Sequence, residues 1–146
     1  MKILITGCAG RVGTAVTAHL VHRGFAIRGI DIVDSYEGGI DYRKCDLLDV
    51  EALSPHVDGV DAVLHLSGYP SSWSHPECID VSTHTTAGTF NVFDACAQHA
   101  VSRVVVASSI NAIGYFFGSV PSSSTTCRST RSIPSSRRTR IPSANR

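Results

Sequence analysis

The first thirteen residues constrain the fold of this chain more than any other segment. An apolar strand expected over residues 2–6 runs directly into a glycine-rich loop. A helix is predicted to follow at once, because Val12, Val16 and Leu20 recur at helical spacing. The backbone N–H groups and the dipole at the start of such a helix favour a negatively charged ligand. The segment therefore predicts a phosphate site between a strand and a helix.

Three glycines give this loop its expected function. Gly7 permits the tight turn, Gly10 lets the backbone approach a pyrophosphate, and Gly13 lets the helix pack closely on the strand. Glycines at this spacing are a weak signal in isolation. The strand before them and the helix after them strengthen the prediction of a dinucleotide site.

Apolar strands alternate with helical patterns as far as residue 118. Near-continuous apolar strands of this kind indicate a parallel sheet that is covered on both faces. Right-handed crossovers then give a doubly wound, Rossmann-like α/β fold of about five strands in the order 3-2-1-4-5, with ligands at the carboxyl ends of the strands. Strands are expected at residues 2–6, 25–31, 41–45, 62–67 and 103–107, and further helices at 50–57 and 81–99.

Composition narrows the class of protein. A chain of 146 residues with 42% hydrophobic residues suits one domain with a real core. No apolar run is long enough to span a membrane, and we expect no signal peptide. The five cysteines have no C-x-x-C spacing, so we expect reduced thiols, no metal site and a cytoplasmic location.

Asp31 ends the strand expected at 25–31, eighteen residues after Gly13. A carboxylate at this point can accept hydrogen bonds from an adenosine ribose, and it repels a 2′-phosphate. The position therefore favours NAD over NADP. The alternative is a solvated aspartate that starts a turn. Arg28 precedes it, but strand alternation points that side chain elsewhere.

Several segments, taken in order, resemble the extended short-chain dehydrogenase/reductase superfamily, in its NAD-dependent epimerase/dehydratase branch. The first is Thr6-Gly7-x-x-Gly10-x-x-Gly13. The serine pair at 108–109, followed by Ile-Gly-Tyr-Phe at 113–116, looks closest to the uronate dehydrogenase-like members. The resemblance covers residues 1–118, and its other segments are Cys45–Asp49, His65–Gly68, Gly88–Val92 and Ala107–Asn111.

The resemblance implies roles for residues at matching positions. Ser109 would hydrogen-bond the reacting oxygen of the substrate, and Asp31 would bind the ribose. Asp46 and Leu47 would contact adenine. The remaining cofactor contacts would come from the glycine loop and from strand ends: Gly7, Gly10, Arg11, Val12, Gly13, Leu66, Ser67, Gly68 and Ser108. Ser71, Ser72 and Asn111 are weaker candidates for substrate contacts.

Each of these segments also has a plainer interpretation. Asp46 could cap the helix that follows, because Asp is favoured at N-caps. Ser67 and Gly68 could be turn residues. His65 is expected to be a packed or hydrogen-bonded histidine rather than a base. Ser108 and its neighbour could simply end a strand. The ordered set as a whole favours the cofactor site.

One element of the family's chemistry is missing from this chain. In the family a tyrosine acts as acid or base, and a lysine four residues later lowers its pKa. Free tyrosine has a pKa near ~10 and needs a nearby cation to work at neutral pH. The chain has only Lys2 and Lys44, and Ser119 stands four residues after Tyr115. Many relatives also have Asn where this chain has Thr85.

The chain divides into two compositions. Residues 1–118, the expected dinucleotide-binding domain, hold seven basic and twelve acidic residues, a net charge of −5. Residues 119–146 hold six Arg, nine Ser and no acid, so we expect a disordered tail. Acids, lysines and apolar periodicity disappear abruptly after residue 118. We therefore hypothesise that the tail is a frame-shifted translation of the family's own continuation. The codons of the tail, read in a shifted frame, are compatible with a segment that contains Tyr-x-x-x-Lys.

The function implied by the resemblance is NAD-dependent oxidoreduction or epimerisation of a sugar, nucleotide-sugar or uronate, catalytically incomplete in this chain. An alternative is a non-catalytic NAD-binding remnant or sensor. A weaker alternative is nucleic-acid binding through the arginines of the tail. Members of the family often pair through helices, so a homodimer is a further expectation. The fold would leave an apolar edge at the strand expected at 103–107.

Overall fold

The computed structural model of the chain describes residues 1–69 and 78–109. It divides into two units, Met1–Ser108 and Ser109–Arg146, which are treated separately. The predicted substrate residues Ser71, Ser72 and Asn111 lie outside the described residues, as do Tyr115 and the tail at 119–146.

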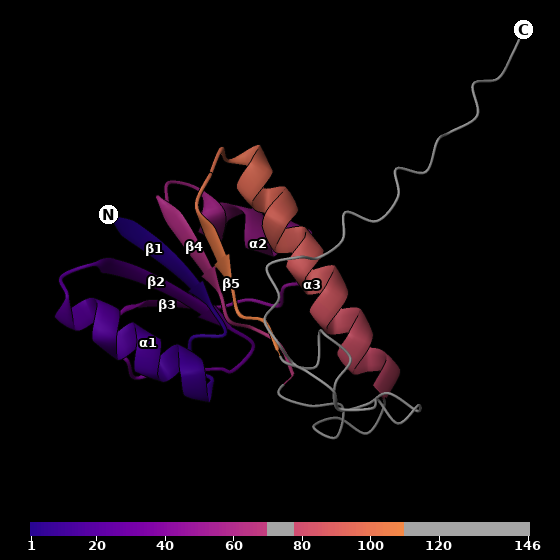
Figure 1. Cartoon of the computed structure of the whole chain (residues 1–146), viewed down its shortest axis with the longest axis horizontal. Helices are drawn as coiled ribbons and strands as arrows, with labels where there is room; N and C mark the ends of the chain where they lie inside the picture. The colour runs from indigo at the N-terminus through magenta and orange to yellow at the C-terminus, as the bar shows by residue number, and fades with distance from the viewer. Residues whose placement is uncertain (70–77, 110–146) are drawn as a thin grey trace, which may run out of the picture. The chain divides into compact units, whose positions relative to one another are not determined.

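The first unit is a five-stranded parallel sheet with helices on both faces (Figure 1). The strand order β3-β2-β1-β4-β5 confirms the doubly wound fold that the sequence predicts. The bounds of the elements differ from the expected ones by at most three residues. They are β1 (Lys2–Thr6), α1 (Arg11–His22), β2 (Ala26–Asp31), β3 (Asp41–Lys44), α2 (Val50–Val57), β4 (Ala62–His65), α3 (Cys78–Gln98) and β5 (Val104–Val106).

The central strand β1 separates two hydrophobic cores. Successive side chains of a strand point to opposite faces of the sheet. Leu4 therefore packs in the cluster that includes Leu53 of α2 and Val92 of α3. Ile3 and Ile5 pack in the other cluster, against the face covered by α1. The parallel pairing of β1 with β2 and with β4 places the carboxyl ends of these three strands side by side.

Helix α1 packs through part of the expected stripe, because Val16 and Leu20 are partly buried against the cluster of Ile3 and Ile5. Gly13 and Thr17 are its buried residues, whereas Val12 is 60% exposed. The reason is the close approach of the helix to the loop before it: a Cβ on Gly13 would lie 2.0 Å from the carbonyl oxygen of Gly7. The contact face therefore runs through Gly13, and Val12 turns outward.

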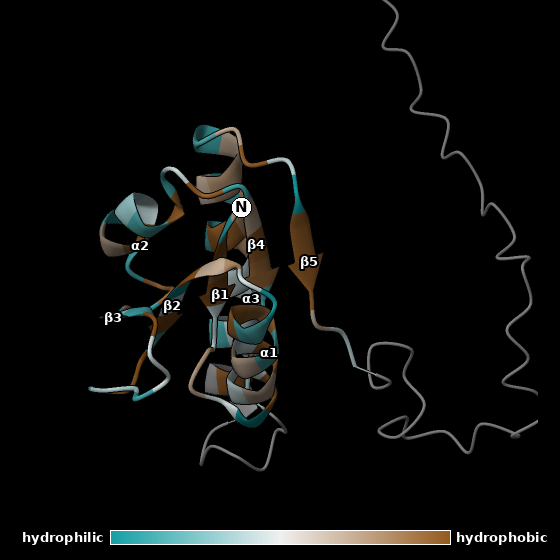
Figure 2. Cartoon of the chain, turned by 90° about the vertical axis from the view of Figure 1, so that its left-hand side faces the viewer, coloured by the Kyte–Doolittle hydropathy of each residue, from teal (hydrophilic) through white to brown (hydrophobic). Residues whose placement is uncertain are grey.

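Strand β5 forms the apolar edge that the sequence predicts (Figure 2). Val105 is 61% exposed and Val106 39% exposed. Within the described part of the chain, no helix combines the length and apolar character needed to cross a membrane.

Candidate functional site

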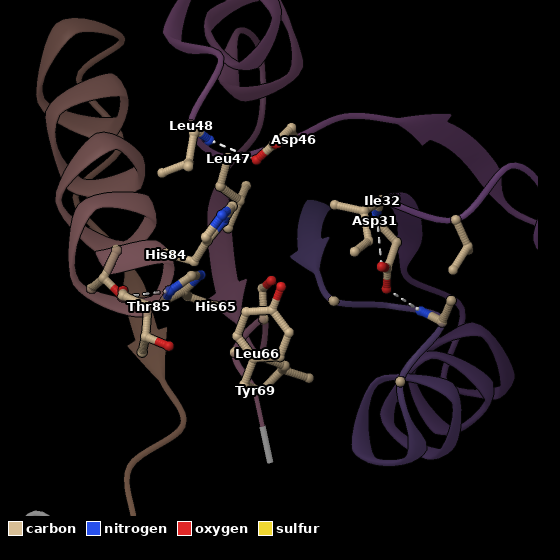
Figure 3. Close-up of a pocket in the computed structure, with 17 residues that line it drawn as sticks. Asp31, Ile32, Asp46, Leu47, Leu48, His65, Leu66, Tyr69, His84 and Thr85 are labelled. Atoms are coloured by element: carbon tan, nitrogen blue, oxygen red, sulfur yellow. Dashed lines mark hydrogen bonds between the residues drawn. The ribbon is translucent and has the colours of Figure 1, made fainter. Parts of the chain in front are cut away.

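A pocket of about 310 Å³ opens where the carboxyl ends of the strands meet (Figure 3). Asp31 and Ile32 lie on one side of it, and His65, His84 and Thr85 lie on the opposite side. Its lining comes from the loop after β1, from the ends of β2, β3 and β4, and from α3: Gly7, Ala9, Gly10, Asp31–Val33, Asp46–Leu48, His65–Tyr69, His84, Thr85 and Thr89.

The glycine loop is built by close backbone contacts. Gly7 has a φ of +71°, which strains any residue with a side chain. Its N–H donates to the carbonyl of Ile30 at 2.9 Å, which ties the loop to β2. A Cβ on Gly7 would also lie 2.7 Å from the backbone of Ser67. The loop can therefore lie between β2 and β4 only because this position lacks a side chain.

The N-terminus of α1 is open toward a ligand. Gly10 is its N-cap, and among the described residues no side chain caps it. The first turn holds no acidic residue. Since the first N–H groups of any helix lack partners within the helix, this terminus can accept an anionic group. A Cβ on Gly10 would approach only the Gly7 carbonyl, at 3.3 Å.

Asp31 joins the glycine loop to the end of β2. Its Oδ2 accepts from the Ala9 N–H at 3.0 Å, and its Oδ1 accepts from the Ile32 N–H at 2.8 Å. Burial and, secondarily, this carboxylate raise the pKa of the neighbouring Cys8 thiol to about 11. Asp31 is therefore a half-buried, oriented carboxylate at the rim of the pocket and not a fully solvated turn residue.

The segment after β3 forms another part of the lining. Asp46 Oδ1 accepts from the Leu48 N–H at 2.9 Å and makes a tight turn. The N-cap of α2 is Asp49, which accepts from the Ala52 N–H at 3.0 Å. The capping interpretation of Asp46 is therefore wrong, because the N-cap lies three residues further on.

His65 is buried at the end of β4 and is 3% exposed. Its Nδ1 lies 2.7 Å from the Thr6 hydroxyl, and its Nε2 lies 2.9 Å from the Thr89 hydroxyl. The Thr89 hydroxyl donates to the Thr85 carbonyl at 2.6 Å, so it accepts from Nε2–H. We therefore assign the neutral tautomer with the proton on Nε2. These two contacts confirm the prediction of a hydrogen-bonded histidine, and burial lowers its pKa.

Comparison with known proteins places the chain in a family. The model of the NAD dependent epimerase/dehydratase family matches residues 3–136. The chain belongs to this family. The match runs beyond residue 118, where the segments noted in the sequence end.

Curated relatives match about three quarters of the chain. A uronate dehydrogenase from Pseudomonas syringae pv. tomato is 31% identical over 118 residues, which are 79% of this chain and 42% of that protein. A 2-alkyl-3-oxoalkanoate reductase from Stenotrophomonas maltophilia is 33% identical over 74% of this chain and 33% of its own length. The chain thus spans less than half the length of these curated relatives.

Two solved structures of the superfamily superpose on the chain. One is a short-chain dehydrogenase/reductase superfamily protein from Agrobacterium tumefaciens with bound NAD, with 41% identity and a TM-score of 0.67 over 75% of this chain and 33% of that one. The other, a glucuronic acid dehydrogenase from Chromohalobacter salexigens, has 32% identity and a TM-score of 0.68 over 79% of this chain and 43% of that one.

Within this family fold, eight of the sixteen site residues predicted from sequence meet at one pocket. Those that line it are Gly7, Gly10, Asp31, Asp46, Leu47, Leu66, Ser67 and Gly68. Arg11, Val12, Gly13 and Ser108 are not among the lining residues. Ser109 belongs to the second unit, so its position relative to the pocket is not described.

Helix α3 and Tyr69 contribute to the pocket in a way that the sequence pattern does not indicate. The rings of Tyr69 and His84 meet edge-on, with centroids 6.0 Å apart, and both residues line the pocket. Thr89 and Asn91 belong to a segment noted for the family resemblance, but their hydrogen-bond partners lie 24 and 44 residues away. No local pattern in the sequence indicates contacts over such separations.

Proposed function

We propose that this chain binds NAD in the pocket. The N-terminus of α1 would hold the diphosphate, Asp31 the adenosine ribose, and the Asp46–Leu48 segment the adenine. The observation that carries the proposal is an uncapped, acid-free helix N-terminus that begins at the glycine loop lining the pocket, with the oriented carboxylate of Asp31 beside it. An anion site and an acceptor for hydroxyl groups therefore stand together, as a dinucleotide requires.

The family name and the relatives support a redox or epimerase role for the whole protein. NAD supplies a hydride acceptor when it is bound. The substrate would be a sugar, nucleotide-sugar or uronate, and Ser109 would hydrogen-bond its reacting oxygen. The buried, unpaired thiols of Cys8, Cys45 and Cys96 support a cytoplasmic location.

A second candidate function is NAD binding without turnover, as in a remnant or a sensor. The sequence favours it, because no lysine follows any tyrosine by four residues. Without a cation to lower its pKa, a tyrosine does not exchange protons readily at neutral pH. This 146-residue chain would then bind the dinucleotide and lack the proton-transfer pair.

Calorimetric titration of the full chain with NAD and NADP tests the binding proposal. We expect NAD to bind more tightly than NADP. Asp31→Ala should weaken NAD binding about tenfold or more, since hydrogen bonds to a charged group are lost, and it should narrow the preference over NADP. The matched control is Asp34→Ala, an exposed carboxylate paired with Lys44, which should change neither titration. An unchanged NAD titration of Asp31→Ala would contradict the assignment.

A turnover assay separates the two candidate functions. The full chain is mixed with NAD and with uronic acids or neutral sugars, and NADH is followed by its absorbance. We expect NAD binding without NADH formation. Steady NADH formation that depends on the sugar would refute the view that this chain is catalytically incomplete.

A further inference from the structure

Helix α3 contacts the segment after β3 at two adjacent points. The Nδ2 of Asn91 donates to the Leu47 carbonyl at 2.8 Å. One turn earlier, a Cβ on Gly88 would lie 3.1 Å from the Leu47 Cβ, which is tighter than ordinary contact. Gly88 therefore lets the helix come close enough for the amide of Asn91 to reach the backbone of Leu47.

This contact fixes one particular peptide group. The Leu47 carbonyl and the Leu48 N–H belong to the same planar unit. Its carbonyl accepts from Asn91, and its N–H donates to Asp46 Oδ1 at 2.9 Å. A planar group held at both ends cannot rotate without breaking one of these bonds. The orientation of the Asp46 carboxylate is thereby linked to the side chain of Asn91.

The geometry points to Asn91 as a positioning residue for the base of the dinucleotide, acting on Asp46 through the Leu47–Leu48 peptide. This inference rests on the proposed binding of NAD in this pocket. Among the described residues, only Oδ1 of Asp46 has a hydrogen-bond partner, so Oδ2 is free to accept from a ligand. A carboxylate oriented in this way favours a base that presents an amino donor over one that presents a carbonyl.

Adenine and hypoxanthine differ in this respect. Adenine carries an exocyclic amino donor, and hypoxanthine carries an oxygen at the same place. NAD and nicotinamide hypoxanthine dinucleotide therefore match in every part except the base. The ratio of their dissociation constants reports on the base contact alone. A variant that is partly unfolded weakens both ligands by the same factor, so the ratio stays unchanged.

The experiment measures both dissociation constants on the full chain by calorimetric titration. Asn91→Leu replaces the amide donor with an apolar side chain of similar size. Asn91→Asp replaces it with a carboxylate that cannot donate when ionised. The control is Gln98→Leu on the same helix, an exposed side chain that donates to Asp94, does not line the pocket and leaves the Leu47 contact in place. Circular dichroism checks that each variant keeps its helices.

We expect the wild-type chain to prefer NAD over the hypoxanthine analogue. Both Asn91 variants should reduce this preference by about fivefold, the equivalent of one hydrogen bond, and Gln98→Leu should leave it unchanged. Equal weakening of both ligands in the Asn91 variants would overturn the inference and leave a purely structural role. Equal binding of both ligands by the wild type would overturn it as well. Failure of the wild type to bind NAD at all would instead refute the proposed function.

Discussion

The two walls of the pocket are held in place by different means. The glycine wall, residues 7–10 with Asp31, depends on backbone contacts at Gly7 and at Gly13 of α1 that leave no room for a Cβ. The helix-held wall, Asp46–Leu48 with His65–Gly68, depends on side-chain hydrogen bonds from Thr89 and Asn91 of α3. One wall is thus specified by the absence of side chains and the other by particular side chains.

This difference affects how each wall should respond to substitution. In a close backbone contact, the atoms on both sides are main chain and cannot rotate away as a side chain can. An added methyl group therefore forces the backbone itself to shift. A hydrogen bond from a side chain can be lost while the backbone stays close to its place. We therefore expect substitutions of Gly7 and Gly13 to act on stability, and those in the helix-held wall to act on ligand selection and pH response.

Among these substitutions, Gly13→Ala should have the largest effect on the stability of the fold. Its Cβ would lie 2.0 Å from the Gly7 oxygen and 2.7 Å from the Cys8 Cα, both of them backbone atoms. We expect a loss of more than about 3 kcal/mol in the free energy of unfolding, measured by urea denaturation, although alanine is the better helix former.

Gly10→Ala is the matched control in the same loop. Its Cβ would meet only the Gly7 oxygen, at 3.3 Å, and the φ of Gly10 is −69°. The fold should lose no more than about 1 kcal/mol, while NAD binding weakens because the methyl group stands where the diphosphate would approach. If Gly13→Ala and Gly10→Ala lose the same stability, the glycine wall is not held by the contact at Gly13.

The two walls also differ in how far the sequence predicts them. Gly7, Gly10, Gly13 and Asp31 follow from local spacing, because a strand, a turn and a helix in succession determine their own geometry. The strand order follows from the rules for right-handed crossovers. The contact between Asn91 and Leu47 joins residues 44 positions apart, and it depends on how closely α3 packs. The spacing of apolar residues predicts that α3 is a helix, but it does not indicate how closely the helix packs against Leu47.

His65 should make the helix-held wall sensitive to pH. Burial lowers its pKa below the ordinary 6.5, so below that value the unfolded chain binds a proton that the folded chain does not. The free energy of unfolding should therefore fall as the pH drops below about 6.5, by at most about 1.4 kcal/mol per pH unit, until His65 protonates in the folded state as well. Urea denaturation between about pH 5 and pH 7.5 measures this slope.

His56 provides the comparison for this slope. Its pKa is also lowered, by burial and then by Arg28 and Arg43, so it contributes with the same sign. We expect both His65→Gln and His56→Gln to flatten the slope. We expect only His65→Gln to flatten the pH dependence of NAD binding, because His65 lines the pocket and His56 does not. An unchanged stability slope in His65→Gln would show that the buried histidine is not the source.

Asp49→Ala should have the smallest effect on stability. It tests whether the N-cap of α2 or the Asn91 contact orients the helix-held wall. Asp49 caps α2 by accepting from the Ala52 N–H, and loss of an N-cap costs about 1 kcal/mol. Asp49→Asn keeps a capping oxygen and should keep the stability in urea denaturation. The preference for NAD over the hypoxanthine analogue should survive in Asp49→Ala, because Asn91 and not the start of α2 holds the Leu47–Leu48 peptide. A preference that disappears together with the cap would mean that the start of α2 sets the orientation of this wall.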